Sequence, residues 1–266
     1  MEWWLAYIAI GVAAGLLAGL LGVGGGIVVV PALAVVFEAQ GVSARYIMPL
    51  ALGTSLATIG FTSLASLRAH HARAAVNWSI ARRLSPGLVL GVLLGASLAA
   101  RLSFHVLTVV FAVFLWIVAT HLLLDTAPRR SGGSPSWVGW SVAGGVIGGV
   151  SGVVGIGGGT LSVPFLLWCG VTLHEAIGTA AAAGFPIALA GALAYLANGL
   201  AVGDLPRYSA GFVYLPAALG VAVASVVAAP LGARLAHRLP TGPLQKLFAL
   251  FLYGVGGRLV YPLWAG

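Results

Sequence analysis

A glycine-rich segment occurs twice in this chain, and the duplication limits the possible folds more than any other feature. Residues 11–33 read GVAAGLLAGLLGVGGGIVVVPAL, and residues 144–166, which start 133 positions later, read GGVIGGVSGVVGIGGGTLSVPFL. At this offset ten of the 23 positions are identical, and the ten include seven glycines and a proline. Because chance similarity would not hold seven glycines in register, the chain contains a duplicated unit.

The duplicated unit belongs to a membrane protein. Hydrophobic residues make up 60% of the 266 residues and charged residues only 7%, and the mean hydropathy is +1.07. A chain of this composition lacks the polar surface that a water-soluble domain requires. Thirteen Lys and Arg against five Asp and Glu give a net charge of +8. Most of these residues stand between apolar runs, where they indicate membrane topology rather than binding of nucleic acid.

Apolar runs of membrane-spanning length predict an all-α polytopic membrane protein with eight long spans and two half-length segments. The long spans are expected near residues 3–21, 46–67, 85–100, 104–124, 137–156, 176–197, 209–231 and 244–264. The half-length segments, residues 27–37 and 160–169, each follow a glycine cluster and contain a proline. They could be re-entrant hairpin arms or short extra crossings, and the sequence leaves this choice open.

The half-length segments decide the predicted topology. If each one turns back, nine Lys and Arg residues share one side of the membrane and at most four share the other, which is the positive-inside pattern. Each copy then has an odd number of crossings, so the second copy is inverted relative to the first. We therefore predict two inverted repeats, residues 1–124 and 137–266, joined by a cytoplasmic linker at 125–136. Each repeat has a glycine-broken helical hairpin and three transmembrane helices, in the cell (inner) membrane with both termini outside.

The glycine clusters are the expected binding site of a transported solute. A backbone that leaves helical geometry inside a bilayer is tolerated only beside protein or a wet cavity. The half-helix that follows each break offers N–H groups and a positive dipole end, which favour an anion. Inverted repeats with broken helices are typical of alternating-access carriers. The regular stripes Gly11/Gly15/Gly19 and Gly144/Gly148/Gly152 are interpreted instead as packing surfaces.

The doubled pattern G-x-x-G-x-G-G-G-x-x-x-x-P is followed by Gly-Thr-Ser at 53–55 in the first half and by Gly-Thr-Ala at 178–180 in the second. This pattern resembles the sulfite exporter TauE/SafE family over essentially the whole chain. The resemblance implies a secondary transporter, an exporter of small sulfur-containing oxyanions such as sulfite or organosulfonates. An anion channel and a carrier of another small anion, such as a carboxylate, remain alternatives. The second half departs from the pattern at Ala180, where a serine hydroxyl is usual.

The expected substrate-binding residues combine the clustered glycines, the hydroxyls of the two following motifs and two basic residues. They are Gly24, Gly25, Gly26, Thr54, Ser55, His121, Gly157, Gly158, Gly159, Thr160, Thr179 and Arg258. Ser162, like the hydroxyls in this set, could also donate to an oxyanion, although Ser and Thr in membrane helices often bond the carbonyl of the preceding turn instead. Arg258 aligns with His121 at an offset of 137 and could attract an anion, although snorkelling to the interface is an equal explanation.

Other classes of function find no support in the residues. The chain has no HExxH or GxSxG motif and no carboxylate cluster, so we do not expect an enzyme, a metal site or a cofactor. All five acidic residues fall at span ends or in loops, which leaves no mid-membrane carboxylate to carry a proton or sodium ion. The expected partners are a small anionic substrate and the lipid bilayer, and a homodimer is left open.

Overall fold

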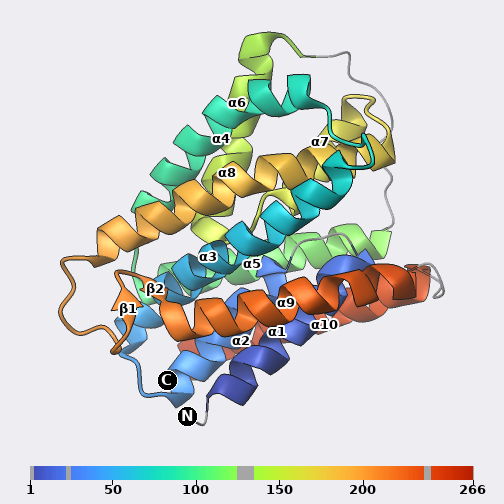
Figure 1. Cartoon of the computed structure of the whole chain (residues 1–266). Helices are drawn as coiled ribbons and strands as arrows, with labels where there is room; N and C mark the ends of the chain where they lie inside the picture. Colours follow the sequence, from blue (N-terminus) through green and yellow to red (C-terminus); the bar gives the residue numbers. More distant parts are fainter. Residues whose placement is uncertain (1–2, 22–24, 125–134, 237–240, 266) are drawn as a thin grey trace.

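The structure is a computed structural model that describes residues 3–21, 25–124, 135–236 and 241–265. Over these ranges the chain forms ten α-helices and one short β-hairpin (Figure 1). The elements are α1 (Trp4–Leu21), α2 (Gly26–Ala39), α3 (Ala44–His71), α4 (Trp78–Ala99), α5 (Phe104–Leu124), α6 (Trp137–Val154), α7 (Gly159–Trp168), α8 (Leu173–Gly199), β1 (Ser209–Ala210), β2 (Val213–Tyr214), α9 (Leu215–Ala236) and α10 (Thr241–Ala265).

Six of the described helices are long and apolar enough to cross a membrane: α3, α4, α5, α6, α8 and α9. The prediction of a multi-pass, helical membrane protein is therefore confirmed, but eight long spans were expected. Trp4–Leu20, the stretch of α1 with described side chains, falls among the shorter apolar helices together with α2 and α7. The eighth expected span, α10, is 25 residues long but is not among the six, and it contains Gln245, Lys246 and Arg258.

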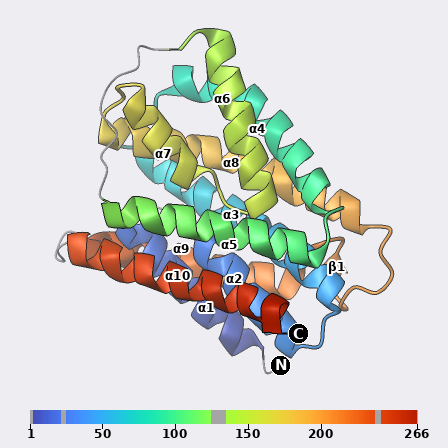
Figure 2. The same ribbon diagram turned by 180° about the vertical axis from the view of Figure 1, so that it is seen from behind.

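Both half-length segments are helices that turn back on the helix before them. α2 has 14 residues and α7 has 10, or about 21 and 15 Å at 1.5 Å per residue, against a hydrocarbon core of about 30 Å. Gln40, directly after α2, donates a hydrogen bond to the Tyr7 hydroxyl near the start of α1. Phe165 in α7 packs edge-to-face on Trp140 near the start of α6, with ring centroids 5.6 Å apart. Each short helix thus returns toward the end where its hairpin began (Figure 2).

Glycine stripes bring two helix pairs into backbone contact. α6 packs on α4, and a methyl group at Gly148 would lie only 2.3 Å from the carbonyl oxygen of Leu88. α1 packs on α9, and a methyl group at Gly15 would lie 2.6 Å from the carbonyl oxygen of Ser225. Only glycine permits such an approach, so these stripes are packing surfaces as interpreted from the sequence. The same close approach is seen at Gly11, Gly144 and Gly152.

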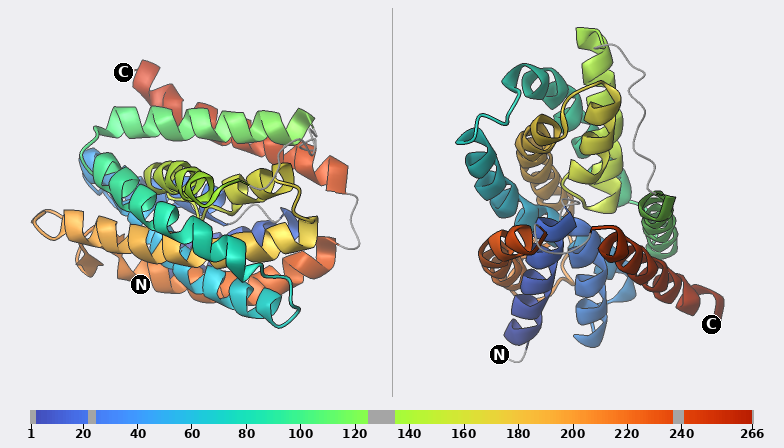
Figure 3. Two further views of the ribbon diagram at one scale, coloured as in Figure 1. Left: turned by 90° about the horizontal axis from the view of Figure 1, so that it is seen from above. Right: turned by 90° about the vertical axis from the view of Figure 1, so that its right-hand side faces the viewer.

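The remaining helices form a central pair and an outer pair. α3 and α8 pack against each other through the middle of the molecule, and α2, α4, α7 and α9 contact them. α5 and α10 lie together on one side, as Figure 3 shows. The Trp116 indole on α5 donates a hydrogen bond of 3.4 Å to the carbonyl oxygen of Tyr253 on α10. The two chain ends lie at the same end of the bundle as the β-hairpin (Figure 1).

Two predicted spans have different starts in the structure. The span expected from residue 209 begins at Leu215, because residues 209–214 form the antiparallel hairpin β1–β2, with a positive φ of +53° at Gly211. The span expected from residue 85 begins at Trp78, because the Asn77 side chain caps the helix by accepting a hydrogen bond from the Ile80 N–H. The predicted linker at 125–136 lies mostly outside the described residues.

Candidate functional site

The tips of the two glycine-broken hairpins touch each other. Gly26 is the first residue of α2, and a methyl group there would lie 2.8 Å from the carbonyl oxygen of Gly155 and 3.1 Å from the Cα atom of Ile156. All three residues are buried. The structure therefore joins two glycine clusters that are far apart in the sequence, in the region enclosed by α3 and α8.

The second cluster is a true helix break. Gly155 ends α6 in the left-handed conformation with a φ of +71°, and its N–H donates to the carbonyl oxygen of Ser151 at 2.8 Å. Gly158 precedes α7 with a φ of +73°. Glycine adopts both conformations without the strain that a Cβ atom would add. The predicted interruption after α6 is confirmed, and two of its glycines are required by backbone geometry.

The first cluster is described only in part. α1 ends at Leu21 and α2 begins at Gly26, so two separate helices flank the cluster as predicted, while Gly24 lies outside the described residues. Gly25 precedes α2 with a φ of −67°, a value that any residue can adopt. A methyl group at Gly25 would make ordinary contact with the Ala14 side chain at 3.5 Å.

Three predicted hydroxyls bind backbone groups of the opposite half of the chain. Ser55 on α3 donates to the carbonyl oxygen of Gly155 at 2.9 Å and so holds the turn of the second cluster. Thr54 accepts a hydrogen bond from the Tyr214 N–H, also at 2.9 Å. The equivalent group in the second half, Thr179 on α8, accepts one from the Asn77 N–H at 2.9 Å. All three hydroxyl residues are fully buried, and their bonds fix the loops and turns that surround the clusters.

Two further hydroxyls, Ser151 on α6 and Ser162 on α7, lie near Gly158. A methyl group at Gly158 would be 3.7 Å from the Oγ atoms of both Ser151 and Ser162. Both serines are fully buried, and neither Oγ has a hydrogen-bond partner among the described residues. Next to them, a methyl group at Gly159 would meet nothing within 4 Å. Thr160, the second residue of α7, is half-buried.

Ser151 belongs to none of the motifs and is not among the substrate-binding residues expected from the sequence. It stands in an apolar helix before the cluster, and in the aligned first copy the same position is Ala18. A hydroxyl present in only one copy of a well-preserved segment is a signal that the sequence does contain. Only the structure shows that this hydroxyl has no hydrogen-bond partner among the described residues.

The structure does not bring the two predicted basic residues to the glycine clusters. His121 near the end of α5 and Arg258 on α10 both have exposed side chains. Their helices form the outer pair, and α10 packs mainly on α5 (Figure 3). If either residue acts on the anion, it does so from the outer helix pair α5–α10, here called the rim, and not from the glycine clusters.

The site carries dipoles rather than charges. Every buried polar residue among those described is a Ser or a Thr, apart from two buried tyrosines and one tryptophan in the core. Glu38 lies in the last turn of α2, Glu175 in the first turn of α8 and Asp204 in a loop. No group of three or more His, Cys, Asp or Glu side chains in the described ranges is placed to hold a metal ion.

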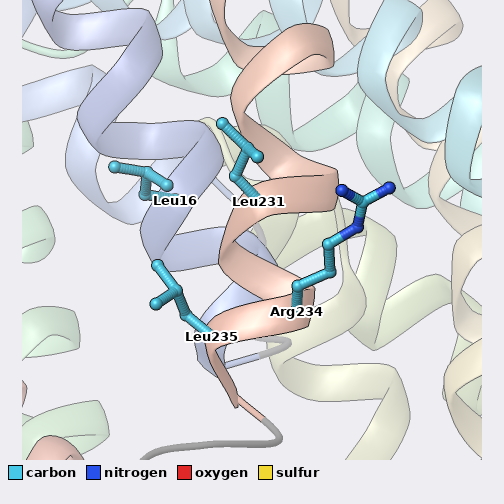
Figure 4. Close-up of a pocket in the computed structure, with 4 residues that line it drawn as sticks. All are labelled: Leu16, Leu231, Arg234 and Leu235. Atoms are coloured by element: carbon cyan, nitrogen blue, oxygen red, sulfur yellow. The ribbon is translucent and has the colours of Figure 1, made fainter.

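An apolar groove lies elsewhere in the described part of the chain. It runs between α1 and α9, has a volume of about 510 Å³ and is lined by apolar residues such as Val12 and Val223. At one end, Leu16, Leu231 and Leu235 line a smaller pocket beside Arg234 (Figure 4). The walls of the larger groove are apolar and offer no polar partner for an oxyanion, so it is not the candidate site. Among the described residues, Arg234 is the one charged residue that lines the smaller pocket.

Comparisons with known proteins agree with this architecture. The family model described as sulfite exporter TauE/SafE matches residues 7–259. A probable membrane transporter protein of Haemophilus influenzae is 36% identical over 249 residues, which cover 93% of this chain and 94% of that protein. A probable membrane transporter protein of Methanocaldococcus jannaschii is 25% identical over 256 residues, covering 94% and 92%. The probable membrane transporter protein YunE of Bacillus subtilis is 24% identical over 275 residues, covering 96% of each chain. No solved structure matches the chain significantly.

Proposed function

Because the chain belongs to the sulfite exporter TauE/SafE family of membrane transporters, we propose that it exports small sulfur-containing oxyanions, such as sulfite or organosulfonates, by alternating access. The observation that carries this proposal is the contact between the two broken hairpins, with the N-terminus of α7 beside open space at Gly159. Backbone N–H groups and the positive end of a helix dipole at such a point stabilise an anion without a cationic side chain.

Alternating access requires two halves that exchange roles, and the packing supports an inverted pair of repeats. In the proposed repeat, α1 corresponds to α6 and α4 corresponds to α9. The contact between α1 and α9 should therefore have an equivalent between α6 and α4, and the structure contains both contacts. In the central pair α3–α8 and in the outer pair α5–α10, the two helices in contact are each other's equivalents in the two halves.

Individual contacts repeat in the same way. A methyl group at Gly53 would lie 2.2 Å from the carbonyl oxygen of Phe212, and one at Gly178 would lie 2.1 Å from that of Ala75. Residues 75 and 212 differ by 137 positions, the offset that aligns the last helices of the two halves. Thr54 accepts a hydrogen bond from the Tyr214 N–H and Thr179 accepts one from the Asn77 N–H, and residues 77 and 214 also differ by 137 positions. This correspondence supports an inverted repeat with the glycine clusters on its axis.

The charges support a cytoplasmic location for the end opposite the termini. Arg68 and Arg234 lie in the last turns of α3 and α9, and Arg73 follows in the loop after α3, at the end of the bundle away from the chain ends (Figure 1). By the positive-inside rule this end faces the cytoplasm and both termini face out. Reporter fusions at the two termini test this orientation, and a cytoplasmic C-terminus would contradict it.

The direction of transport follows from the membrane potential. Moving one negative charge outward, down the electrical gradient of an inside-negative membrane, gains about 2.3 kcal/mol per 100 mV. An uncoupled carrier would therefore export a monoanion present at equal concentrations on the two sides. The described carboxylates lie at helix ends or in a loop, so none of them is placed to carry a proton through the middle of the membrane.

Flux measurements test the proposal. Purified protein in lipid vesicles should take up labelled sulfite or an organosulfonate with saturation, and unlabelled substrate on the far side should accelerate the flux. Acetate should compete poorly. Flux that neither saturates nor responds to substrate on the far side would indicate a channel, and preference for acetate would indicate a carboxylate carrier. Either result overturns the proposal.

A further inference from the structure

We propose that Ser151 and Ser162 are the side-chain ligands of the transported anion, so that the second half of the molecule binds it, and that the site selects a small oxyanion with a single negative charge. This inference rests on the proposed transport function and deepens it by naming ligands and substrate charge.

The two serines behave unlike the other helical hydroxyls of the molecule. Thr58, Ser85 and Thr108 each donate to the carbonyl oxygen four residues earlier, at distances of 2.7 to 2.9 Å. That bond is the usual way to satisfy a hydroxyl inside an apolar helix. Ser151 and Ser162 make no such bond and no other, although both are fully buried. A buried hydroxyl without a partner costs about 1–3 kcal/mol, so a ligand is the simplest account of the pair.

The position of the pair matches a binding site. The serines come from different helices, α6 and α7, yet their Oγ atoms flank the same point, 3.7 Å from a methyl group at Gly158. The point itself is filled by Ile187 from α8, whose Cδ1 atom lies 2.4 Å from the same methyl position, whereas a methyl group at the adjoining Gly159 would meet nothing within 4 Å. The open space for an anion is therefore at Gly159, the first residue of α7, with the apolar Ile187 side chain and the two serines close by.

The first half of the molecule cannot form an equivalent site. At the aligned positions it has Ala18 and Val29, which bring no hydroxyl. Val29 is buried in the apolar core. Gly26 at the tip of the first hairpin is packed against Gly155 instead of bordering open space. Both hairpins consist of a longer helix followed by a short one, but only the second offers these side-chain ligands.

The absence of buried charge sets the charge of the ligand. Within the described ranges no Lys, Arg or His side chain is buried, so the anion meets hydroxyls and a helix dipole alone. The cost of taking an ion out of water rises steeply with its charge, and no buried cation among the described residues offsets it here. We therefore expect monoanions such as a sulfonate to be preferred over the sulfate dianion.

Thermal unfolding of the full-length purified protein tests the assignment, with methanesulfonate as the monoanion and sulfate as the dianion. Methanesulfonate should stabilise the wild type through mass action, and sulfate much less at the same concentration. In Ser151→Ala and Ser162→Ala the concentration that gives half-maximal stabilisation should rise roughly tenfold or more, because each change removes a hydrogen bond to a charged group. Without ligand both variants should melt no lower than the wild type, because the lost hydroxyl had no partner.

Two variants serve as controls. Ser225→Ala removes a buried hydroxyl that donates to the Gly11 carbonyl oxygen at 2.9 Å, so it should melt lower without ligand yet keep the wild-type response to methanesulfonate. Ser162→Thr keeps the hydroxyl and should keep the response. Wild-type response in the Ser151→Ala/Ser162→Ala double variant would overturn the ligand assignment, and equal stabilisation by sulfate would overturn the charge assignment. If either assignment fails while the wild type still shows a saturable flux of sulfite, the proposed transport function stands. If the wild type shows no saturable flux of sulfite, both the transport function and the ligand assignment are wrong.

Discussion

The two glycine hairpins share the same glycine cluster and proline, with ten of 23 aligned positions identical, and differ in what surrounds them. The α6–α7 hairpin contains two left-handed glycines, two buried hydroxyls without partners, and open space at Gly159. In the α1–α2 hairpin, Gly25 has a helical φ and Gly26 is pressed against the other hairpin. The comparison teaches that a duplicated sequence motif can place a short helix after a longer one in both copies, while the conformation of aligned glycines and the side chains beside the cluster differ.

The contact between the hairpin tips links this difference to function. Ser55 holds the Gly155 carbonyl from α3, and Gly26 touches the same oxygen from the other side. Movement of one hairpin relative to the other must therefore alter the turn that precedes the anion site. The first hairpin then acts on the site through its packing, and the second through direct binding.

The largest effect is expected from substitutions at equivalent positions of the two clusters. Gly158→Val should abolish transport, and Gly158→Ala should reduce it at least about tenfold, because a left-handed residue with a Cβ atom is strained by about 1–3 kcal/mol and that atom meets Ile187. Gly25→Ala should change flux little. Vesicle flux, with membrane insertion checked by detergent extraction, measures all three. Equal losses in Gly25→Ala and Gly158→Ala would mean that the two hairpins contribute alike.

A second pair of glycines tests what the two halves share. Gly53→Ala and Gly178→Ala each force a methyl group to about 2 Å from a backbone carbonyl oxygen, so each should lower the free energy of unfolding by up to about 3 kcal/mol. Gly60→Ala is the control, since a methyl group there meets nothing within 4 Å; it should be neutral or stabilise the helix by up to about 1 kcal/mol. Thermal unfolding in detergent measures the changes, and a stable Gly178→Ala variant would contradict the inverted repeat.

A smaller, matched effect is expected from the two threonines. Thr54→Val leaves the Tyr214 N–H without its acceptor and Thr179→Val does the same to the Asn77 N–H, so each should cost about 1–2 kcal/mol. Because the two bonds are equivalent in the proposed repeat, the losses should agree within about 0.5 kcal/mol. Denaturant titration of the purified variants measures them. A loss in only one variant would show that the halves differ in these contacts as well.

The smallest effect is expected at the rim. Arg258 lies on the outer helix α10, so Arg258→Gln should reduce the apparent affinity for the anion by no more than about threefold, since a rim charge acts mainly on the rate of encounter. Arg258→Lys should restore the wild-type value, and His121→Gln should change it less. Concentration dependence of uptake measures the difference. A loss comparable with that of Gly158→Ala would place the basic residues inside the site.

Local features of the structure follow closely from the sequence, and long-range ones do not. Hydropathy located the long helices and the two half-length helices, because the preference for a bilayer is a property of each segment. Helix starts were less accurate at α4 and α9. At α4, the charged Arg82 and Arg83 interrupt the apolar run, so hydropathy did not show that the helix begins just after its cap, Asn77. At α9, the preceding hairpin depends on contact with α8, since a methyl group at Gly211 would lie 2.0 Å from the Leu196 carbonyl oxygen.

The candidate site shows the same division. The sequence pointed to the glycines, to Ser55 and to the two threonines by motif, but it could not say which hydroxyls would be satisfied. Thr54 finds its partner 160 residues away, and Ser55 finds its partner 100 residues away. Ser151, which carries no motif, is left without a partner.

By itself the sequence determined that this chain lies in a membrane, is duplicated, belongs with a family of transporters, and breaks its helices at glycine clusters. These properties depend on composition and on residues close together in the chain. Only the tertiary structure decided that the two hairpins meet, that Ser151 and Ser162 face one point, and that Arg258 stays at the rim. Hydrogen-bond partners and burial arise when helices distant in the sequence pack together, and inside a bilayer each polar group must find its partner among those helices.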